Sequence, residues 1–269
     1  MMRHATIAIL LILLSFGWVV SSCGQTGALP APQTEEVLSR LDSVIGCRDM
    51  YVREKERRLD SLRSIVATAG NGDRYRLYDR IFTEYYSYDL DSAVVYASRK
   101  AEAAEASGGG LRLSVAGLNL ARVLLSQGHT YEAMRELQEV LPDTVFPVVK
   151  SMWYDFMAVY DGIRGRGSLQ WHRRMSAVLD TASPGWIYNE SNLRRLSGNL
   201  DGAADVLVAN RDKLPDTPHN QAITNYLLGK VCLQRRDTVG AIRHIAGSAV
   251  NDIMTPVRDY KSLHELASL

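Results

Sequence analysis

Apolar residues recur every three or four positions along most of this chain from Glu35 onward. This spacing gathers them on one face of an α-helix, and the alternation of apolar and polar residues that predicts strands is nearly absent. The charged segment 48–58 suits a solvated helix face. We therefore expect an amphipathic helix region over 35–70, formed by one long helix or two short ones and ended by residues 70–73. The apolar positions of this region are Val37, Leu38, Leu41, Val44 and Ile45, then Leu59, Leu62, Ile65 and Val66.

The helical pattern also repeats along the chain. Its clearest copy runs from Leu120 to Val140 and is similar to the tetratricopeptide consensus, a helical hairpin of about 34 residues. Further copies fall at 77–97, 198–207 and 226–249. Small residues within these copies allow the two helices of a hairpin to approach closely. The residues expected to pack in this way are Ala93, Ala121, Gly128, Ala133, Ala203, Gly229 and Ala241.

Four of these alanines set the period of the repeat. They stand at positions 93, 133, 203 and 241, so they are 40, 70 and 38 residues apart, and 70 is two steps of 35. A divergent copy is therefore expected in the gap, with its two helices within 152–179. One hairpin cannot bury its apolar face alone, so neighbouring copies must stack.

The predicted fold is all-α. We expect a tetratricopeptide-like superhelical array of about five helical hairpins over 73–269, with an extra N-terminal helix before it. The last hairpin is expected to be incomplete, because 259–269 reads as the opening helix of one more copy. An irregular helical bundle is the alternative architecture.

The order of several short motifs resembles the tetratricopeptide-containing transcriptional regulators of Bacteroidetes, over about residues 40–269. In that family an exported repeat domain is followed by a transmembrane helix, a coiled coil and a cytoplasmic effector segment. None of these appears before Leu269, which leaves open a fragment, a truncated paralogue or an independent lipid-anchored form. The motifs are Leu41-Asp42-Ser43, Tyr75-x-Leu77-Tyr78-Asp79-x-Ile81-Phe82, Tyr88-x-Leu90-Asp91-Ser92-Ala93 and Ala249-Val250-Asn251-Asp252-Ile253.

The N-terminus has the pattern of an export signal. Arg3 precedes an apolar run over 5–20, which is shorter than the roughly 20 residues that a membrane-spanning helix needs. Small residues follow this run. We therefore expect a signal peptide over 1–22 and an exported protein on the periplasmic side.

The end of this signal, Val20-Ser21-Ser22-Cys23, resembles a bacterial lipobox. The resemblance implies cleavage after Ser22 and lipidation of Cys23, so that the mature protein is a lipoprotein held at a membrane by its N-terminus. Residues 23–34 would then form a flexible tether. Ordinary cleavage with an incidental Cys23, or retention of the run as an anchor, are the alternatives.

Charge and cysteine content narrow the classes of partner. Lys and Arg number 31 against 30 Asp and Glu, which gives a net charge of +1. This balance argues against nucleic acid as a binding partner of this segment. The three cysteines are too few and too scattered for a disulfide framework or a zinc site. We expect Cys47 and Cys232 to be reduced and buried between helices.

No pattern in the sequence predicts catalysis, a metal or a cofactor. The six histidines form neither HxxxH nor HExxH, and GxSxG and Walker motifs are absent. We therefore name no catalytic residue, and the histidines are expected on the surface or in loops. The run 107–110 (Ser-Gly-Gly-Gly) lies between two predicted helices, and no strand precedes it as in a phosphate-binding loop. We therefore interpret it as a linker.

Two groups of residues have open interpretations. The arginines 164, 166, 173, 174, 194, 195, 235 and 236 would form a basic stripe if they shared a face, but interspersed acids favour ordinary solvated surfaces. Six tyrosines between positions 75 and 96 favour core packing, with a peptide-binding groove as the alternative. Together these patterns predict a non-catalytic, membrane-anchored scaffold that binds a protein or peptide. The alternative is the periplasmic sensor portion of a membrane-bound transcriptional regulator.

Overall fold

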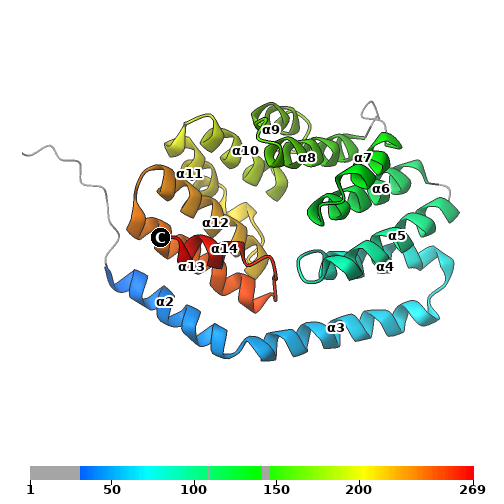
Figure 1. The fold of residues 1–269 in the computed structure, drawn as a ribbon, viewed down its shortest axis with the longest axis horizontal. Helices are drawn as coiled ribbons and strands as arrows, with labels where there is room; N and C mark the ends of the chain where they lie inside the picture. Colours follow the sequence, from blue (N-terminus) through cyan, green and yellow to red (C-terminus); the bar gives the residue numbers. More distant parts are fainter. Residues whose placement is uncertain (1–30, 108, 141–145) are drawn as a thin grey trace, which may run out of the picture.

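The chain is all-α in the computed structural model, which describes residues 31–107, 109–140 and 146–269. Within these ranges it forms thirteen α-helices, one short 3-10 helix and no strand (Figure 1). The predicted fold class is confirmed. The predicted signal peptide, the cleavage site at Ser22, the lipidation site at Cys23 and most of the tether lie outside the described residues.

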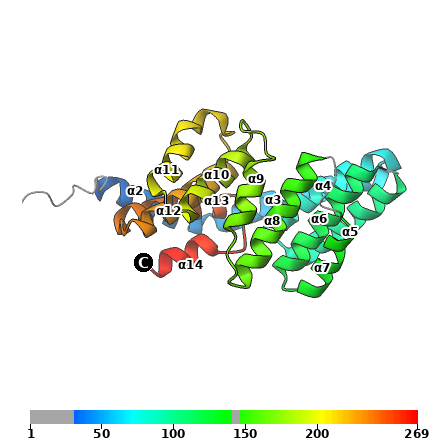
Figure 2. The same ribbon diagram turned by 90° about the horizontal axis from the view of Figure 1, so that it is seen from above.

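Ten of the helices pair into five consecutive antiparallel hairpins, which follow one another around the molecule (Figures 1 and 2). They are α4 (Asn71–Tyr86) with α5 (Leu90–Ala106), α6 (Gly110–Ser126) with α7 (Thr130–Gln138), α8 (Pro147–Ile163) with α9 (Leu169–Ser176), α10 (Pro184–Leu196) with α11 (Leu200–Ala209), and α12 (Pro218–Gln234) with α13 (Thr238–Met254). The 3-10 helix η1 (Arg211–Lys213) follows α11. The divergent copy expected within 152–179 corresponds to α8 and α9.

Short polar side chains start the second helix of three hairpins. Asp89, Asn199 and Asp237 each accept a hydrogen bond from a backbone N–H in the first turn of α5, α11 and α13. These caps satisfy N–H groups that have no partner within the helix. The tight turns before α7 and α11 contain Gly128 and Gly198, whose φ angles are +84° and +83°, a conformation that glycine adopts without steric cost.

The predicted packing residues lie mostly where the helices of a hairpin cross. Ala93, Ala121, Ala133, Ala203 and Ala241 are fully buried. In α12 an added Cβ on Gly229 would lie 2.6 Å from Ile245 Cγ1 of α13, so only glycine fits at this crossing. Gly128 differs from the expectation: it is exposed, and nothing lies within 4 Å of an added Cβ. Its role is to allow the turn, not to bring two helices together.

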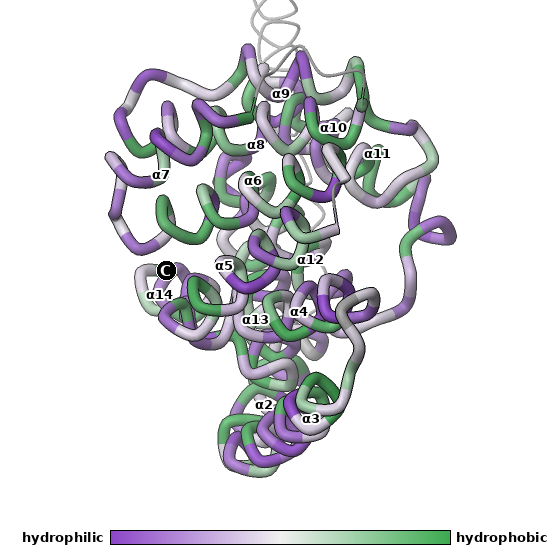
Figure 3. Tube along the Cα trace, turned by 90° about the vertical axis from the view of Figure 1, so that its right-hand side faces the viewer, coloured by the Kyte–Doolittle hydropathy of each residue, from purple (hydrophilic) through white to green (hydrophobic). Residues whose placement is uncertain are grey.

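Two further helices join the ends of the array into a ring. We call α2 (Ala31–Gly46) and α3 (Arg48–Thr68) the strap. Leu41 and Val44 of α2 pack on Ala249 and Ile253 of the last hairpin. Leu59 and Leu62 of α3 pack against the first hairpin. Figure 3 shows the strap beside the hairpins, with hydrophobic and hydrophilic residues alternating along its tube.

The two ends of the array also touch directly. The backbone N–H of Arg258, which follows the last hairpin, donates to the backbone oxygen of Ser87 in the first hairpin at 2.8 Å. Its guanidinium Nη2 donates to Tyr88 Oη at 3.0 Å. We call these contacts of Arg258 the latch. Strap and latch together turn a five-hairpin array into a closed ring (Figure 1).

The last helix, α14 (Lys261–Ala267), occupies the position expected for an opening helix at 259–269. It packs on α13 and lies close to α12 on the inner side of the ring (Figures 1 and 2).

Several details of the N-terminal region differ from the sequence expectations. The region 35–70 forms two helices, one of the two arrangements expected, but the first begins at Ala31, inside the predicted tether. Asn71, expected to end a helix, is the first residue of α4, and Gly70 occupies the N-cap position in an extended conformation. Lys55, expected in solvent, is buried, because its ammonium pairs with Glu84 at 3.1 Å and lies 5.4 Å from the centre of the Tyr88 ring.

The two cysteines within the described residues are free. Cys232 is buried in α12, as expected, and burial raises the pKa of its thiol. Cys47 was expected to be buried but is exposed, because it stands at the bend where α2 ends and α3 begins.

Candidate binding cavity

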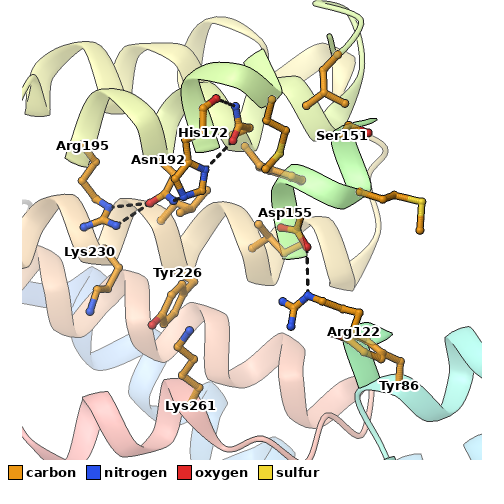
Figure 4. Close-up of a pocket in the computed structure, with 18 of the residues that line it drawn as sticks. Tyr86, Arg122, Ser151, Asp155, His172, Asn192, Arg195, Tyr226, Lys230 and Lys261 are labelled. Carbon is orange, nitrogen blue, oxygen red and sulfur yellow. Dashed lines mark hydrogen bonds and ion pairs between the residues drawn. The ribbon is translucent and has the colours of Figure 1, made fainter. Parts of the chain in front are cut away.

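The inner face of the ring encloses a cavity of about 850 Å³ (Figure 4). Small-molecule and cofactor sites commonly have volumes between about 300 and 1,000 Å³. The first helix of every hairpin contributes to the wall, and α9 and α14 complete it. The lining includes Tyr86, Asn119, Arg122, Met152, Asp155, His172, Asn189, Asn192, Arg195, Tyr226, Lys230, Lys261 and Glu265.

The charged side chains of the cavity do not balance. Its lining contains four cations, Arg122, Arg195, Lys230 and Lys261, against the carboxylates of Asp155 and Glu265, an excess of two positive charges. Arg122 Nε pairs with Asp155 Oδ2 at 3.2 Å, and Lys230 Nζ pairs with Glu265 Oε1 at 2.8 Å. In the part of the chain that the structure describes, no carboxylate oxygen lies within ion-pair distance of Arg195 or Lys261.

A chain of hydrogen bonds fixes the position of Arg195. The amide nitrogen of Asn189 donates to the backbone oxygen of His172 at 2.9 Å, so its Oδ1, 2.7 Å from His172 Nδ1, accepts from that ring nitrogen. In the neutral ring the other nitrogen, Nε2, then accepts from Asn192 Nδ2 at 3.1 Å. Asn192 Oδ1 accepts from Arg195 Nη2 at 2.6 Å and from its Nε at 3.2 Å. Each nitrogen and oxygen in this series of hydrogen bonds is therefore assigned consistently as a donor or as an acceptor.

A second cluster lies beside Arg195, where Tyr226 Oη donates to Glu265 Oε1 at 2.8 Å. Burial and this hydrogen bond raise the pKa of Tyr226 far above its ordinary value, so the phenol stays protonated. Burial disfavours ionisation of Glu265, but hydrogen bonds from Lys230 and Tyr226 outweigh it and hold the Glu265 pKa below its usual range. The Lys261 ammonium lies 4.9 Å from the centre of the Tyr226 ring. Arg195, Lys230 and Lys261 therefore surround Tyr226 on one side of the cavity (Figure 4).

The remaining arginines of the sequence do not form one stripe. Arg194 turns away from its neighbour and pairs with Glu190 at 2.9 Å, Arg235 pairs with Asp201, and Arg164 lies over the ring of Tyr160. Of the six tyrosines at 75–96, Tyr85, Tyr88 and Tyr96 are buried in the core, and Tyr86 lines the cavity.

The sequence predicted residues at the helix crossings but not the cavity. His172 was expected at the surface or in a loop, but it lies half-buried in α9 and joins two asparagines. One signal could have found this wall. In three first helices the residue directly after the crossing position faces the cavity: Arg122 after Ala121, Asn192 after Ser191, and Lys230 after Gly229. Ser191 is the crossing residue of α10, since its buried hydroxyl donates to the backbone oxygen of Ala203 in α11 at 2.8 Å.

The described residues contain neither a metal-binding cluster nor a membrane-spanning helix. No group of three or more His, Cys, Asp or Glu side chains there has an arrangement that could hold a metal ion. None of the helices described combines the length and the apolar character needed to cross a membrane.

Comparison with known families places most of this chain in a single family. A family model described as the SusR N-terminal TPR domain covers residues 45–163 and 167–269. The chain belongs to this family. The match includes all of α3 and all five hairpins, so the second helix of the strap falls within the region that the family shares. The prediction of a tetratricopeptide array is confirmed. No curated protein and no solved structure matches the chain.

Proposed function

We propose that this protein is a non-catalytic binding module whose ring holds a segment of a protein or peptide in its central cavity. The observation that carries the proposal is the cavity itself. It presents two cations without an ion-pair partner among the described residues, together with the amide of Asn119, on a wall built by all five hairpins. Amide side chains both donate and accept hydrogen bonds, as a peptide backbone requires.

The fold supports the same conclusion. Arrays of stacked helical hairpins present their inner faces as extended binding surfaces, and the tetratricopeptide family is typically a protein-interaction scaffold. Here the strap and the latch hold the two ends of the array together, so the wall is preorganised. A preorganised site loses less conformational entropy when its ligand binds.

Export and lipid anchoring are part of the proposal and rest on the sequence of the N-terminus. The apolar run 5–20 and the motif ending at Cys23 support a lipoprotein whose ring lies on the periplasmic side of a membrane. Replacing Cys23 with serine should move the protein from the membrane fraction to the soluble fraction and abolish labelling by a radioactive fatty acid. Unchanged partition and labelling would refute the anchor.

A second candidate function is the sensor portion of a transcriptional regulator. It is favoured by the family description, which names an N-terminal domain of the SusR type. In that case occupancy of the cavity would be relayed to further segments of a longer protein. Sequencing the gene beyond codon 269 tests this candidate, because an in-frame apolar run of about 20 residues would be needed to cross the membrane.

The binding function is tested by photocrosslinking in cells that produce the full chain. Benzoylphenylalanine replaces Tyr86, which lines the cavity, or Tyr131, whose side chain is exposed on α7. The two variants carry the same reactive group, one inside the cavity and the other on the outer surface. A polypeptide crosslinked at position 86 and not at position 131 supports the proposal. The same products at both positions, or none at position 86, would refute it.

A further inference from the structure

One side of the cavity concentrates positive charge although the whole protein is almost neutral. The chain has a net charge of +1, whereas the cavity lining alone has an excess of two. Both surplus charges, Arg195 and Lys261, lie at the same end of the cavity, together with Lys230 (Figure 4). We call these three residues the cationic corner. They come from α10, α12 and α14, so the fold brings them together from three separate elements.

We infer that the cationic corner binds a carboxylate, and that the peptide held by the ring is acidic, with an Asp or Glu side chain placed between Arg195 and Lys261. This inference deepens the proposed function and rests on it. Charge complementarity selects the occupant, because an anion would neutralise the local excess that the protein leaves uncompensated.

The geometry of Arg195 suits this role. Its Nε and Nη2 are committed to Asn192 Oδ1, which leaves the donors of Nη1 and one donor of Nη2 for a ligand. Hydrogen bonds between a guanidinium and a carboxylate are short and about twice as strong as neutral ones. Burial lowers the pKa of Arg195, although the negative charge of Glu265 partly offsets the effect. A bound carboxylate would compensate the buried charge.

The other members of the corner complete the site. Lys261 is exposed at the cavity edge, and its ammonium makes a cation–π contact with the Tyr226 ring. Lys230 pairs with Glu265, so the two side chains together are close to neutral and the net positive charge of the corner comes from Arg195 and Lys261. Beyond the corner the wall is mixed, with apolar Leu118, Met152, Ile223 and Leu227 in addition to polar Asn119. Such a wall suits side chains and backbone amides that flank one acidic residue better than it suits a polyanion such as nucleic acid, which needs a longer cationic track.

The test measures binding of the full chain to immobilised peptide pools. One pool contains random hexapeptides with Glu at the third position, and the matched pool has Gln there. Both are capped at their ends, so that terminal charges do not contribute. We expect the Glu pool to bind at least about tenfold more tightly than the Gln pool, the loss typical of one missing charge-assisted contact.

The variants Arg195→Gln and Lys261→Gln should each abolish the preference for the Glu pool while leaving the circular dichroism spectrum unchanged. The melting temperature should also stay the same for Lys261→Gln, because Lys261 is exposed. Arg173→Gln is the matched control, because Arg173 is an exposed cation of α9 outside the cavity lining, and it should retain the preference. Raising salt from 50 to 500 mM should weaken binding of the Glu pool more than binding of the Gln pool.

Other outcomes overturn the inference in distinguishable ways. Equal binding of both pools would refute carboxylate recognition and leave the peptide-binding function intact. Failure of both pools, with no crosslinked polypeptide at position 86, would refute both. Stabilisation by free glutarate without binding of either pool would place the anion on a small molecule and refute the peptide.

Discussion

The guanidinium carbon of Arg258 lies 4.1 Å from the centre of the Tyr88 ring, although 170 positions separate the two residues. The same phenol donates a hydrogen bond to Glu56 Oε1 of the strap at 2.5 Å. Tyr88 is thus contacted by the last hairpin's exit segment on one side and by the strap on the other. This one side chain joins the three parts that must meet for the ring to close.

Removing the latch should therefore destabilise the whole ring. For Arg258→Ala we expect the free energy of unfolding to fall by about 1–2 kcal/mol, the sum of one cation–π contact and one hydrogen bond. Urea denaturation followed by circular dichroism measures the change. Both variants keep the backbone hydrogen bond to Ser87. Arg258→Lys also keeps the cation, so it should lose less than half as much. An Arg258→Ala protein as stable as the parent would contradict closure through this residue.

The crossing of α12 and α13 requires glycine at position 229. Gly229→Ala should lower the free energy of unfolding by about 1–2 kcal/mol, because crowding against Ile245 outweighs the gain in helix propensity. Thermal and urea denaturation give the value.

A double-mutant cycle separates crowding from propensity at this crossing. In an Ile245→Ala background the obstacle is gone, so Gly229→Ala should become neutral or stabilising. Gly162→Ala in α8, where nothing lies within 4 Å of an added Cβ, controls for propensity alone and should be stabilising or neutral. Equal losses at Gly229 in both backgrounds would exclude a steric role of Ile245.

Arg236 adopts a left-handed backbone conformation with φ of +61°, at the turn where two other hairpins have Gly128 and Gly198. A side chain with a Cβ is strained there, so Arg236→Gly should raise the free energy of unfolding by about 0.5–1 kcal/mol. Gly198→Ala should lower it by a similar amount. The two melting temperatures must move in opposite directions if the turns are equivalent.

Acid should weaken the protein through His244. Burial is the main cause that lowers the pKa of His244 below 6.5, with Arg243 acting in the same direction, so the folded state favours the neutral ring. Below about pH 6.5 the unfolded chain takes up a proton that the folded chain resists, and stability falls by at most about 1.4 kcal/mol per pH unit. In His244→Gln this contribution disappears. The difference in stability between parent and variant should therefore decline from pH 7.5 to pH 5, and a constant difference would refute the assignment.

The hairpins could be predicted from the sequence because their information is local. Ala133 and Ala241 belong to a series of alanines spaced close to multiples of the repeat length, and capping residues such as Asp237 stand directly before the helices that they start. Ring closure could not be predicted in this way. The apolar stripes of 35–70 show that both strap helices must be covered, but Leu41 and Leu59 do not indicate which hairpin covers them. The local sequence around Arg258 or around Tyr88 does not indicate that the two residues are in contact.

The cavity was missed for a related reason. Arg195 belongs to a pair of adjacent arginines, and adjacent residues of a helix point in directions about 100° apart. Arg194 accordingly faces Glu190 and solvent, while Arg195 faces the cavity. His172 has no second histidine at a metal-ligand spacing, so only the hairpin register reveals that Asn189 and Asn192 lie on both sides of it.

The strap that closes the ring also limits how this protein can diversify. An open stack of hairpins gains or loses a unit at its ends, and its binding surface lengthens or shortens accordingly. A closed circle has no such end, since an added hairpin would separate α13 from α2 or α4 from α3 and expose both apolar seams. The circumference is therefore fixed, and new ligand preferences must come from exchanges of single inward-facing side chains.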